Sequence, residues 1–238
     1  MSAKDIILKP IDSKKANEFV KKHHYSWKVV NNSQLHFGVF INNILWWVMS
    51  YWPSTDKSKL IWLIEWTERN EFIELNRMAF SDLLPKNSES RAIAISMKLL
   101  KKKAPHLKRI ISFADGCQCW DWTIYRASGF ELTQVNKNKS SSIIKLPNWD
   151  IIATLQLRKW WWYRKDMTMK WYSNYLEYLN KEHNWWFALD WYMLRYIKHI
   201  KPNLKRNYEI LPYSKIQDMW AWMYKWEKKE TISLADNQ

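Results

Sequence analysis

The chain has 238 residues, and its 38 Lys and Arg residues exceed its 23 Asp and Glu residues, which gives a formal net charge of +15. This length suits one large domain, or one domain with an appended lobe, with a proper core. No run of about 18 apolar residues is present, so the sequence indicates no membrane span. The N-terminus lacks a signal-peptide core, so we expect a cytoplasmic protein, and the basic excess favours nucleic acid as partner over a merely solvated basic surface.

The first elements are a strand at Asp5–Leu8 and a helix at Ser13–Lys22, with Ser13 expected as the N-cap. His24 and Tyr25 follow the helix. Histidines at this place can simply favour the negative end of the helix dipole. A His-Tyr pair in a loop is equally a candidate for base recognition or proton transfer.

A hairpin is predicted next, with strands at Leu35–Phe40 and Ile44–Tyr51 and its turn at Asn42 and Asn43. Phe72–Phe80 then alternates as a half-buried strand whose end faces a cleft. Arg77 on this strand is either an exposed cation or a buried guanidinium aimed at an anion.

The loop Ser81–Ser90 leads into a helix that runs to about Lys102. Asn87, Ser88 and Ser90 can cap its amino end, where free backbone N–H groups can also hold an anion. The lysines at its carboxyl end suit the helix dipole, so they need not indicate DNA.

The stretch Leu107–Phe130 combines an apolar strand, a polar turn beginning at Asp115 and a short helix that carries Tyr125. Active sites are commonly formed where an Asp at the carboxyl end of a strand lies near a Tyr of the following helix. An Asp after a strand is also a common turn or cap residue. The two cysteines, in Cys117-Gln-Cys119, are too close for an ordinary disulfide or a complete zinc site, and we predict no metal ligands.

The remaining chain contains a hairpin at Ser142–Leu155, a gripping or disordered loop at Trp160–Lys170, an apolar and basic segment at Tyr192–Ile200 and a last strand at Lys205–Leu211. The order of elements predicts an α/β fold with a mixed central sheet flanked by helices, as in acyltransferases. We expect one domain over 1–238, with 156–238 as a C-terminal extension packed on or gripping beside the core.

The chain has 19 Trp and 3 Gly residues, whereas average usage would give roughly 17 Gly. Several Trp residues occupy turns, such as Trp52 before Pro53 and Trp149 in the predicted second hairpin. Some bacterial lineages and their phages read UGA as glycine, and translating such a gene with UGA as tryptophan would produce this pattern. The alternative is an aromatic surface that stacks on bases, but turns that need a positive φ are poor places for such a surface.

The segments HHYSW, FGVF, ELNRMAFSDLLPKNSESRAI, ISFADG and TIYRASGF together resemble the Mom family of phage DNA-modification proteins, which belongs to the GNAT acyltransferase-like superfamily. The resemblance covers most of the chain from His23 to Phe130 and continues through the second hairpin and YMLRYI. The departures are Trp residues where the family is expected to have mostly glycine. They are Trp46, Trp47, Trp52, Trp120, Trp122, Trp149, Trp185, Trp186, Trp220 and Trp222.

The resemblance implies a transferase that converts adenine in double-stranded DNA to an N6-carbamoylmethyl (acetamido) derivative, which protects phage DNA from restriction in the host cytoplasm. It implies catalytic roles for His24, Tyr25, Asp115 and Tyr125, and donor binding by Arg77 and Ser90. Asn87 and Ser88 join the donor site because they lie at the same helix end. In these roles Asp115 would take a proton from the amine, Tyr125 would be a general acid at the leaving group, and His24 and Tyr25 would handle protons or position the base.

The loop Ser81–Ser90 is not glycine-rich, unlike the phosphate-binding loop of coenzyme A-dependent GNAT enzymes. This difference weakens the case for acetyl-CoA as the acyl donor and leaves an aminoacyl-type donor open, and the sequence does not settle whether a metal is required. Two other functions stay open. One is a GNAT-type N-acyltransferase for a protein or small-molecule amine, and the other is a non-catalytic basic DNA-binding protein.

Overall fold

The computed structural model describes residues 2–24, 29, 32–54, 57–81, 84–117, 123–137, 143–145, 151–153, 161–173, 175–182, 187–219, 221, 223–224 and 227–228. They fall into two compact units that interleave along the chain. Unit 1 comprises 1–114, 122–134 and 194–213, and unit 2 comprises 115–121, 135–193 and 214–238. The expected single domain with an extension from 156 stays a prediction.

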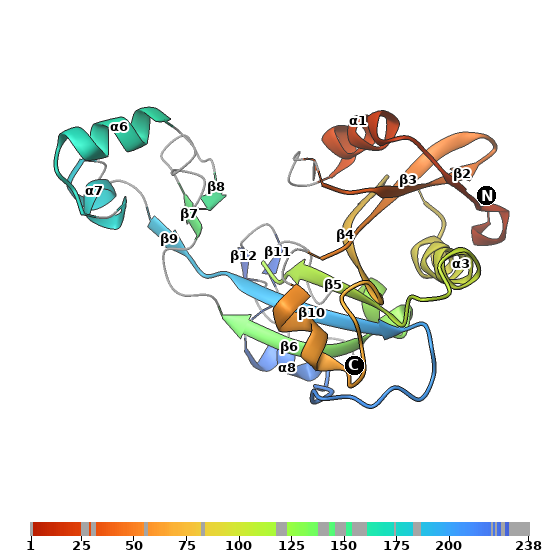
Figure 1. Cartoon of the computed structure of the whole chain (residues 1–238). Coiled ribbons are helices and arrows are strands. Elements are labelled where there is room, and N and C mark those ends of the chain that lie inside the picture. The colour runs from red at the N-terminus through yellow and green to blue at the C-terminus, as the bar shows by residue number, and fades with distance from the viewer. Residues whose placement is uncertain are drawn as a thin grey trace, which may run out of the picture. The chain divides into compact units, whose positions relative to one another are not determined.

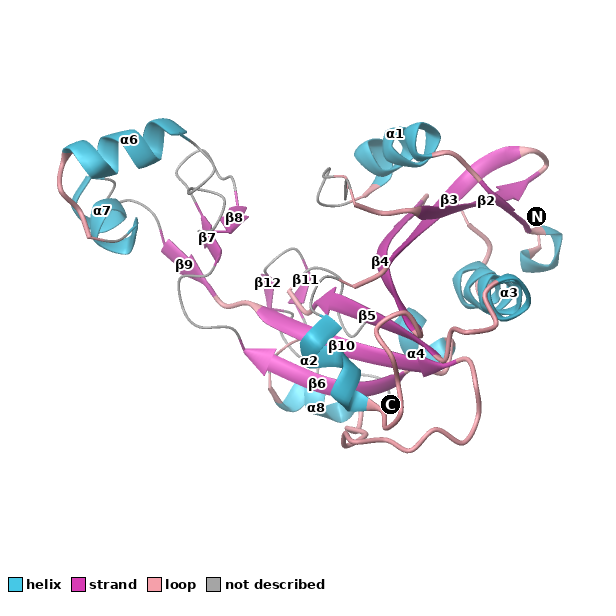
Figure 2. Cartoon of the chain, viewed as in Figure 1, coloured by secondary structure: helices cyan, strands magenta, loops and turns pink. Residues whose placement is uncertain are grey.

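A seven-stranded mixed sheet has the order β1-β2-β3-β4-β5-β10-β6 (Figure 2). The strands are β1 (Ile7–Pro10), β2 (Leu35–Ile41), β3 (Ile44–Trp52), β4 (Phe72–Phe80), β5 (Arg109–Asp115), β10 (Tyr192–His199) and β6 (Glu131–Lys137). The strands from β1 to β4 pair antiparallel, whereas β4 and β5 pair parallel. The predicted α/β class with a mixed central sheet is confirmed.

The β2–β3 hairpin turns at Asn42 and Asn43, as predicted. Both residues have a positive φ, 50° and 62°, which asparagine tolerates better than most residues and which matches the twist of a tight hairpin.

Helix α1 (Ser13–His23) begins at Asp12, whose Oδ1 accepts a hydrogen bond from the Lys15 N–H at 2.8 Å. The expectation of Ser13 as the N-cap is therefore wrong, because the preceding carboxylate takes that place. The first strand also lies two residues later than predicted, after the 3₁₀ helix η1 (Ala3–Asp5).

Two helices pack on opposite faces of β3 (Figure 1). Ala16 and Val20 of α1 pack with Val48 and Ala79. On the other face, the hydroxyl of Tyr51 bonds at 2.7 Å to Ser96 of α3 (Ser88–Lys103). Residues of β3 and β4 therefore alternate between an α1 face and an α3 face.

Strands β4 and β5 are paired over three residues only, from Phe72↔Arg109 to Glu74↔Ile111. Beyond that point their carboxyl ends are unpaired with each other. Ser112 bridges the point of divergence, because its Oγ donates to the Leu75 carbonyl at 2.7 Å. The short helix α4 (Thr123–Ala127) follows the turn after β5 and ends before Gly129, whose φ of 67° suits glycine.

The other described elements of unit 1 are α2 (Lys57–Leu60) and η2 (Ile61–Leu63). Unit 2 contains β7 (Ile143–Lys145), β8 (Ile151–Ala153) and β9 (Phe187–Leu189), which form a sheet of order β8-β7-β9, together with α6 (Trp161–Met169), α7 (Tyr175–Glu182), α8 (Ser214–Asp218), β11 (Met223–Tyr224) and β12 (Glu227–Lys228). The second predicted hairpin is confirmed by the antiparallel pairing of β7 with β8.

Two expectations for the C-terminal part are wrong. The predicted loop at Trp160–Lys170 contains helix α6, and the predicted last strand at Lys205–Leu211 is reduced to one bridge between Arg206 and Ile64. Within the described ranges, no helix has both the length and the apolar character that a membrane crossing requires.

Candidate active site

His24 and Arg77 meet on the α1 face of the sheet. His24 caps the carboxyl end of α1 and is 5% exposed, and its Nε2 lies 3.2 Å from Nη1 of Arg77. A guanidinium can only donate, so Nε2 accepts, and the neutral ring carries its proton on Nδ1. Burial, and then the charge of Arg77, lower the pKa of His24 to about 3. His24 is thus an uncharged hydrogen-bonding group, and Tyr25 lies outside the described residues.

Two further polar residues lie in the same row of the sheet and were not predicted from the sequence. Cross-strand pairing places His36 opposite Ser50 and Ser50 opposite Arg77, and Nδ1 of His36 lies 2.8 Å from Oγ of Ser50. His36 and Ser50 are buried. The signal that could have found them is a His and a Ser at inward positions of two otherwise apolar strands.

The amino end of α3 begins at Asn87, which adopts a left-handed conformation with φ 69° and makes no side-chain cap. Capping by the Asn87 amide is therefore a wrong expectation. Ser90 Oγ donates to the Asn87 carbonyl at 3.3 Å. Ser88 is fully buried, and its hydroxyl has no hydrogen-bond partner among the described residues. This helix end can still accept an anion through its backbone N–H groups.

The structure shows Arg77 in contact with His24 rather than beside these α3 residues. Arg77 points to the face that α1 covers, because it lies two residues before Ala79 and shares its face, whereas α3 packs on the other face. The predicted joint role of Arg77 and Ser90 at one donor group stays a prediction.

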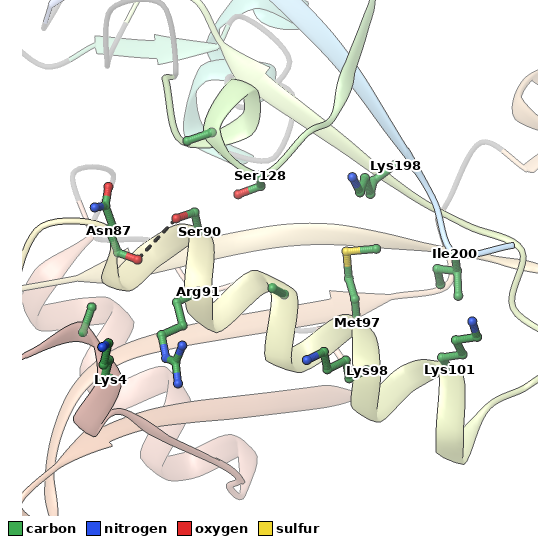
Figure 3. Close-up of a pocket in the computed structure, with 13 residues that line it drawn as sticks. Lys4, Asn87, Ser90, Arg91, Met97, Lys98, Lys101, Ser128, Lys198 and Ile200 are labelled. Atoms are coloured by element: carbon green, nitrogen blue, oxygen red, sulfur yellow. Dashed lines mark hydrogen bonds between the residues drawn. The ribbon is translucent and has the colours of Figure 1, made fainter. Parts of the chain in front are cut away.

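A groove of about 640 Å³ runs along α3 (Figure 3). Asn87 and Ser90 line one end, and five cationic side chains also line the groove, with Lys4 at the Asn87 end. These are Lys4, Arg91, Lys98, Lys101 and Lys198. Among the described residues that line the groove there is no Asp or Glu, so its electrostatic potential favours anions.

Tyr125 of α4 is 2% exposed and stacks on Tyr196 with ring centroids 4.3 Å apart. Its hydroxyl lies 2.7 Å from Oγ of Ser112. Because Ser112 gives its only proton to the Leu75 carbonyl, Tyr125 donates to Ser112. The hydroxyl proton of Tyr125 is thus held at the point where β4 and β5 diverge.

Asp115 ends β5 and belongs to unit 2. Its Oδ1 accepts a hydrogen bond from the Cys117 N–H at 2.8 Å, so it is a turn residue as well as a candidate base. Burial raises the pKa of Asp115 to about 6, against the opposing effect of that hydrogen bond. A carboxylate with such a pKa is suited to proton transfer near neutral pH.

Cys117 follows in the same turn, and burial, reinforced by the Asp115 charge, raises the pKa of its thiol to about 12. The thiol is therefore not a nucleophile at neutral pH. The convergence of Asp115 with Tyr125 stays a prediction, since the two residues fall in different units. No cluster of three metal-binding side chains occurs in the part of the chain that the structure describes.

These observations define a basic α/β protein with a half-buried carboxylate of raised pKa, a neutral His hydrogen-bonded to an Arg, and a cationic groove. Residues 5–215 match the Mom protein family, and the chain belongs to that family. It is 33% identical over 129 residues to the methylcarbamoylase mom of Escherichia phage Mu, an alignment that covers 54% of each chain. The chain thus spans about half the length of this curated relative.

Solved acetyltransferases show low similarity to the chain. Arabidopsis thaliana NAA60, in complex with a bisubstrate analogue, has a TM-score of 0.49 and 6% identity, with 82% of this chain and 97% of that chain covered. The ribosomal-protein-S18-alanine N-acetyltransferase of Escherichia coli has a TM-score of 0.45 and 7% identity, with 83% and 96% covered. A GNAT family acetyltransferase of Elizabethkingia anophelis with acetyl-CoA bound has a TM-score of 0.39 and 16% identity, with 56% and 81% covered.

Proposed function

We propose that the protein is a DNA-modifying transferase that adds a carbamoylmethyl group to N6 of adenine and thereby protects phage DNA from restriction. Family membership over residues 5–215 and the likeness to a phage methylcarbamoylase support this proposal. The observation that carries it within the site is Asp115, a half-buried carboxylate with a pKa of about 6 at the end of a central strand.

Asp115 acts as the base in the proposed reaction. The exocyclic amine of adenine is a weak nucleophile, so removal of one proton during attack lowers the barrier. A bond forms from N6 to the transferred carbon of the donor, the leaving group departs with its bonding electrons, and the Asp115 carboxylate takes the N6 proton. Tyr125 then donates its hydroxyl proton to the leaving group, and Ser112 holds that hydroxyl in place beforehand.

His24 acts in this scheme as a neutral hydrogen-bond donor through Nδ1–H. Its low pKa excludes a role as a general base at neutral pH, because a ring with a pKa of about 3 accepts protons poorly. Arg77 fixes the ring by donating to the other nitrogen. Together the two residues position the adenine rather than move its proton. Since N6 of a paired adenine is shielded, the base is flipped or transiently opened.

The donor binds by an anionic group at the amino end of α3. The buried Ser88 hydroxyl without a partner in the described structure and the backbone N–H groups of the first turn provide its contacts. An acetyl-CoA donor would leave an acetyl group on N6, whereas a glycyl donor carries all the atoms of a carbamoylmethyl group. Attack of N6 on the glycyl carbonyl carbon gives the isomeric glycyl amide, so a carbamoylmethyl product requires a bond from N6 to the methylene carbon, formed directly or by a later rearrangement. The composition of the adduct therefore distinguishes the two donors.

The proposal is tested by expressing the chain in a bacterium without prophages, digesting the DNA to nucleosides and measuring them by mass spectrometry. A modified deoxyadenosine that depends on expression supports the proposal. Unmodified DNA together with an acylated protein or small amine would support the rival N-acyltransferase. Salt-dependent DNA binding with neither product would support a non-catalytic DNA-binding protein.

A further inference from the structure

The cationic groove along α3 extends well beyond the candidate donor end. Arg91, Lys98 and Lys101 lie on one side of the helix, because they are spaced by seven and three residues. At 1.5 Å per residue they cover about 15 Å of the helix axis, a length over which one strand of B-DNA carries about four phosphates. Lys198 of β10 lies across the groove from α3 (Figure 3).

These cations have no carboxylate partner within the described part of the chain. The ion pairs of the described residues involve lysines outside the groove, such as Lys108 with Glu71 and Lys205 with Glu65. Lys198 donates to the Gly129 carbonyl at 2.9 Å, a neutral contact that fixes its position and leaves its charge uncompensated. Unpaired cations gathered on one groove repel one another, and an external anion relieves this repulsion.

The far half of the groove offers charge without base recognition. Its lining there consists of Met97, Lys98, Lys101, Lys198 and Ile200. An ammonium group is a point charge on a flexible stem, and the two apolar side chains provide no hydrogen bonds for a base or a ribose. The groups that could recognise a particular ligand, Asn87 and Ser90, lie at the opposite end. This composition fits a repeating phosphate backbone better than a single nucleotide.

We propose that the far half of this groove binds the phosphate backbone of the DNA substrate. The inference rests on the proposed function in that DNA is the substrate, and it adds the surface along which the DNA lies. Lys98, Lys101 and Lys198 contact successive phosphates, and these contacts are independent of sequence. They hold the duplex on unit 1 without choosing the modified site.

The test compares two double variants of the full chain. Lys98→Ala/Lys101→Ala removes two charges from the groove, whereas the matched control Lys102→Ala/Lys103→Ala removes two exposed charges from the same helix end that do not line the groove. Binding to an unmodified duplex is measured by fluorescence anisotropy between 50 and 200 mM salt, as is usual for counterion release. Circular dichroism melting checks that both variants are folded.

The groove variant should bind DNA roughly tenfold or more weakly than the control at about 0.1 M salt, and its salt slope should fall by about 2, since each lost phosphate contact removes about 0.9. Equal affinities and slopes for the two variants would overturn the inference while leaving the proposed function intact. Weaker binding of coenzyme A with unchanged DNA binding would overturn it in favour of a donor site. If the native protein failed to bind DNA at any salt concentration, the proposed function would fail with it.

Discussion

Nη1 of Arg77 lies 3.2 Å from Nε2 of His24, and this contact fixes His24 as a neutral ring with its proton on Nδ1. Sequence reasoning assigned the two residues to different tasks, one to the base and one to the donor. Their contact on the α1 face joins them in one hydrogen-bonded pair, which in the proposed function positions the adenine.

The His24 ring should not titrate between about pH 5 and 8 in NMR spectra, with the His24→Gln variant used to assign its resonances. Arg77→Gln removes the charge and keeps a hydrogen-bond donor, so the pKa of His24 should rise from about 3 while staying below its ordinary value of 6.5, because burial is the larger cause. A native ring that titrates near 6.5 would refute the neutral pair.

Tyr125 and Ser112 share a hydrogen bond, and their variants separate catalysis from packing. Tyr125→Phe removes the acidic proton and keeps the ring stacked on Tyr196, so modification should fall by ~10²–10⁴ per folded molecule. Ser112→Ala removes the same hydrogen bond but keeps the Tyr125 hydroxyl, and should stay within about tenfold of native activity although it lowers stability by roughly 1–3 kcal/mol. Equal losses of activity would mean that the Tyr125 hydroxyl is structural.

Asp115 should destabilise the folded protein at neutral pH. Its folded pKa of about 6 exceeds the value of 3.8 expected for an exposed Asp, so the folded state binds more protons between about pH 4 and 6, and stability falls as the pH rises through that range. Asp115→Asn keeps the acceptor for the Cys117 N–H and removes the buried charge. It should stabilise the protein by up to ~3 kcal/mol above about pH 6, with no gain at pH 4.

The matched control for this measurement is Asp190→Asn. Asp190 is exposed and forms an ion pair with Lys137 at 2.9 Å, so its loss should cost less than about 1 kcal/mol and stabilise nothing. Melting followed at pH 4 and 7.5 on both variants decides the matter. A lower melting temperature for Asp115→Asn than for the native chain at pH 7.5 would contradict the buried-charge account.

Two exposed Trp residues have left-handed backbones, Trp66 with φ 55° and Trp171 with φ 59°. Trp171 follows α6 at the position where Gly usually ends a helix, since the Tyr172 N–H reaches back to the Met167 carbonyl at 3.1 Å. Trp66→Gly and Trp171→Gly should each stabilise the protein by roughly 1 kcal/mol. Trp62→Gly is the control, because Trp62 is also exposed but lies in η2 without a positive φ. A stabilising effect of the control equal to that of the two variants would remove the backbone argument for glycine.

Three other Trp residues, Trp46, Trp47 and Trp52, lie on β3 without a positive φ, so the expectation that Trp52 occupies a turn is wrong. Their indole N–H groups are buried without a hydrogen-bond partner in the described structure, which is unusual for tryptophan. Trp46 is also the extra residue of a β-bulge, since Val39 pairs with Trp47 and Phe40 with Leu45. These features support glycine in the natural protein, and reading the codons at these positions would test it directly.

The strands and long helices could be predicted because their apolar periodicity is strong, as in β2, β3 and α3. Local competition defeated the prediction elsewhere. Asp12 rather than Ser13 caps α1. Residues 161–169 form helix α6, although the adjacent Trp residues at its start predict a loop.

The sequence predicts several residues of the candidate site, such as His24 and Arg77, but not their contact, and it does not predict His36 or Ser50. A β-bulge shifts the strand register by one residue and so changes which face of the sheet a side chain occupies. Whether Arg77 faces His24 or the α3 end therefore depends on the bulges in β3 and β4, which cannot be located from the sequence. The His36–Ser50 contact could not be predicted for the same reason, because it depends on the register between two strands.

The most direct test of the central claim is the amount of modified deoxyadenosine in DNA from cells that express either the native chain or Asp115→Asn at matched levels. We predict modified deoxyadenosine with the native chain and none detectable with Asp115→Asn, although that variant is folded and melts at a higher temperature at neutral pH. Equal modification by the two proteins would contradict the assignment of Asp115 as the base, and unmodified DNA from both would contradict the proposed activity.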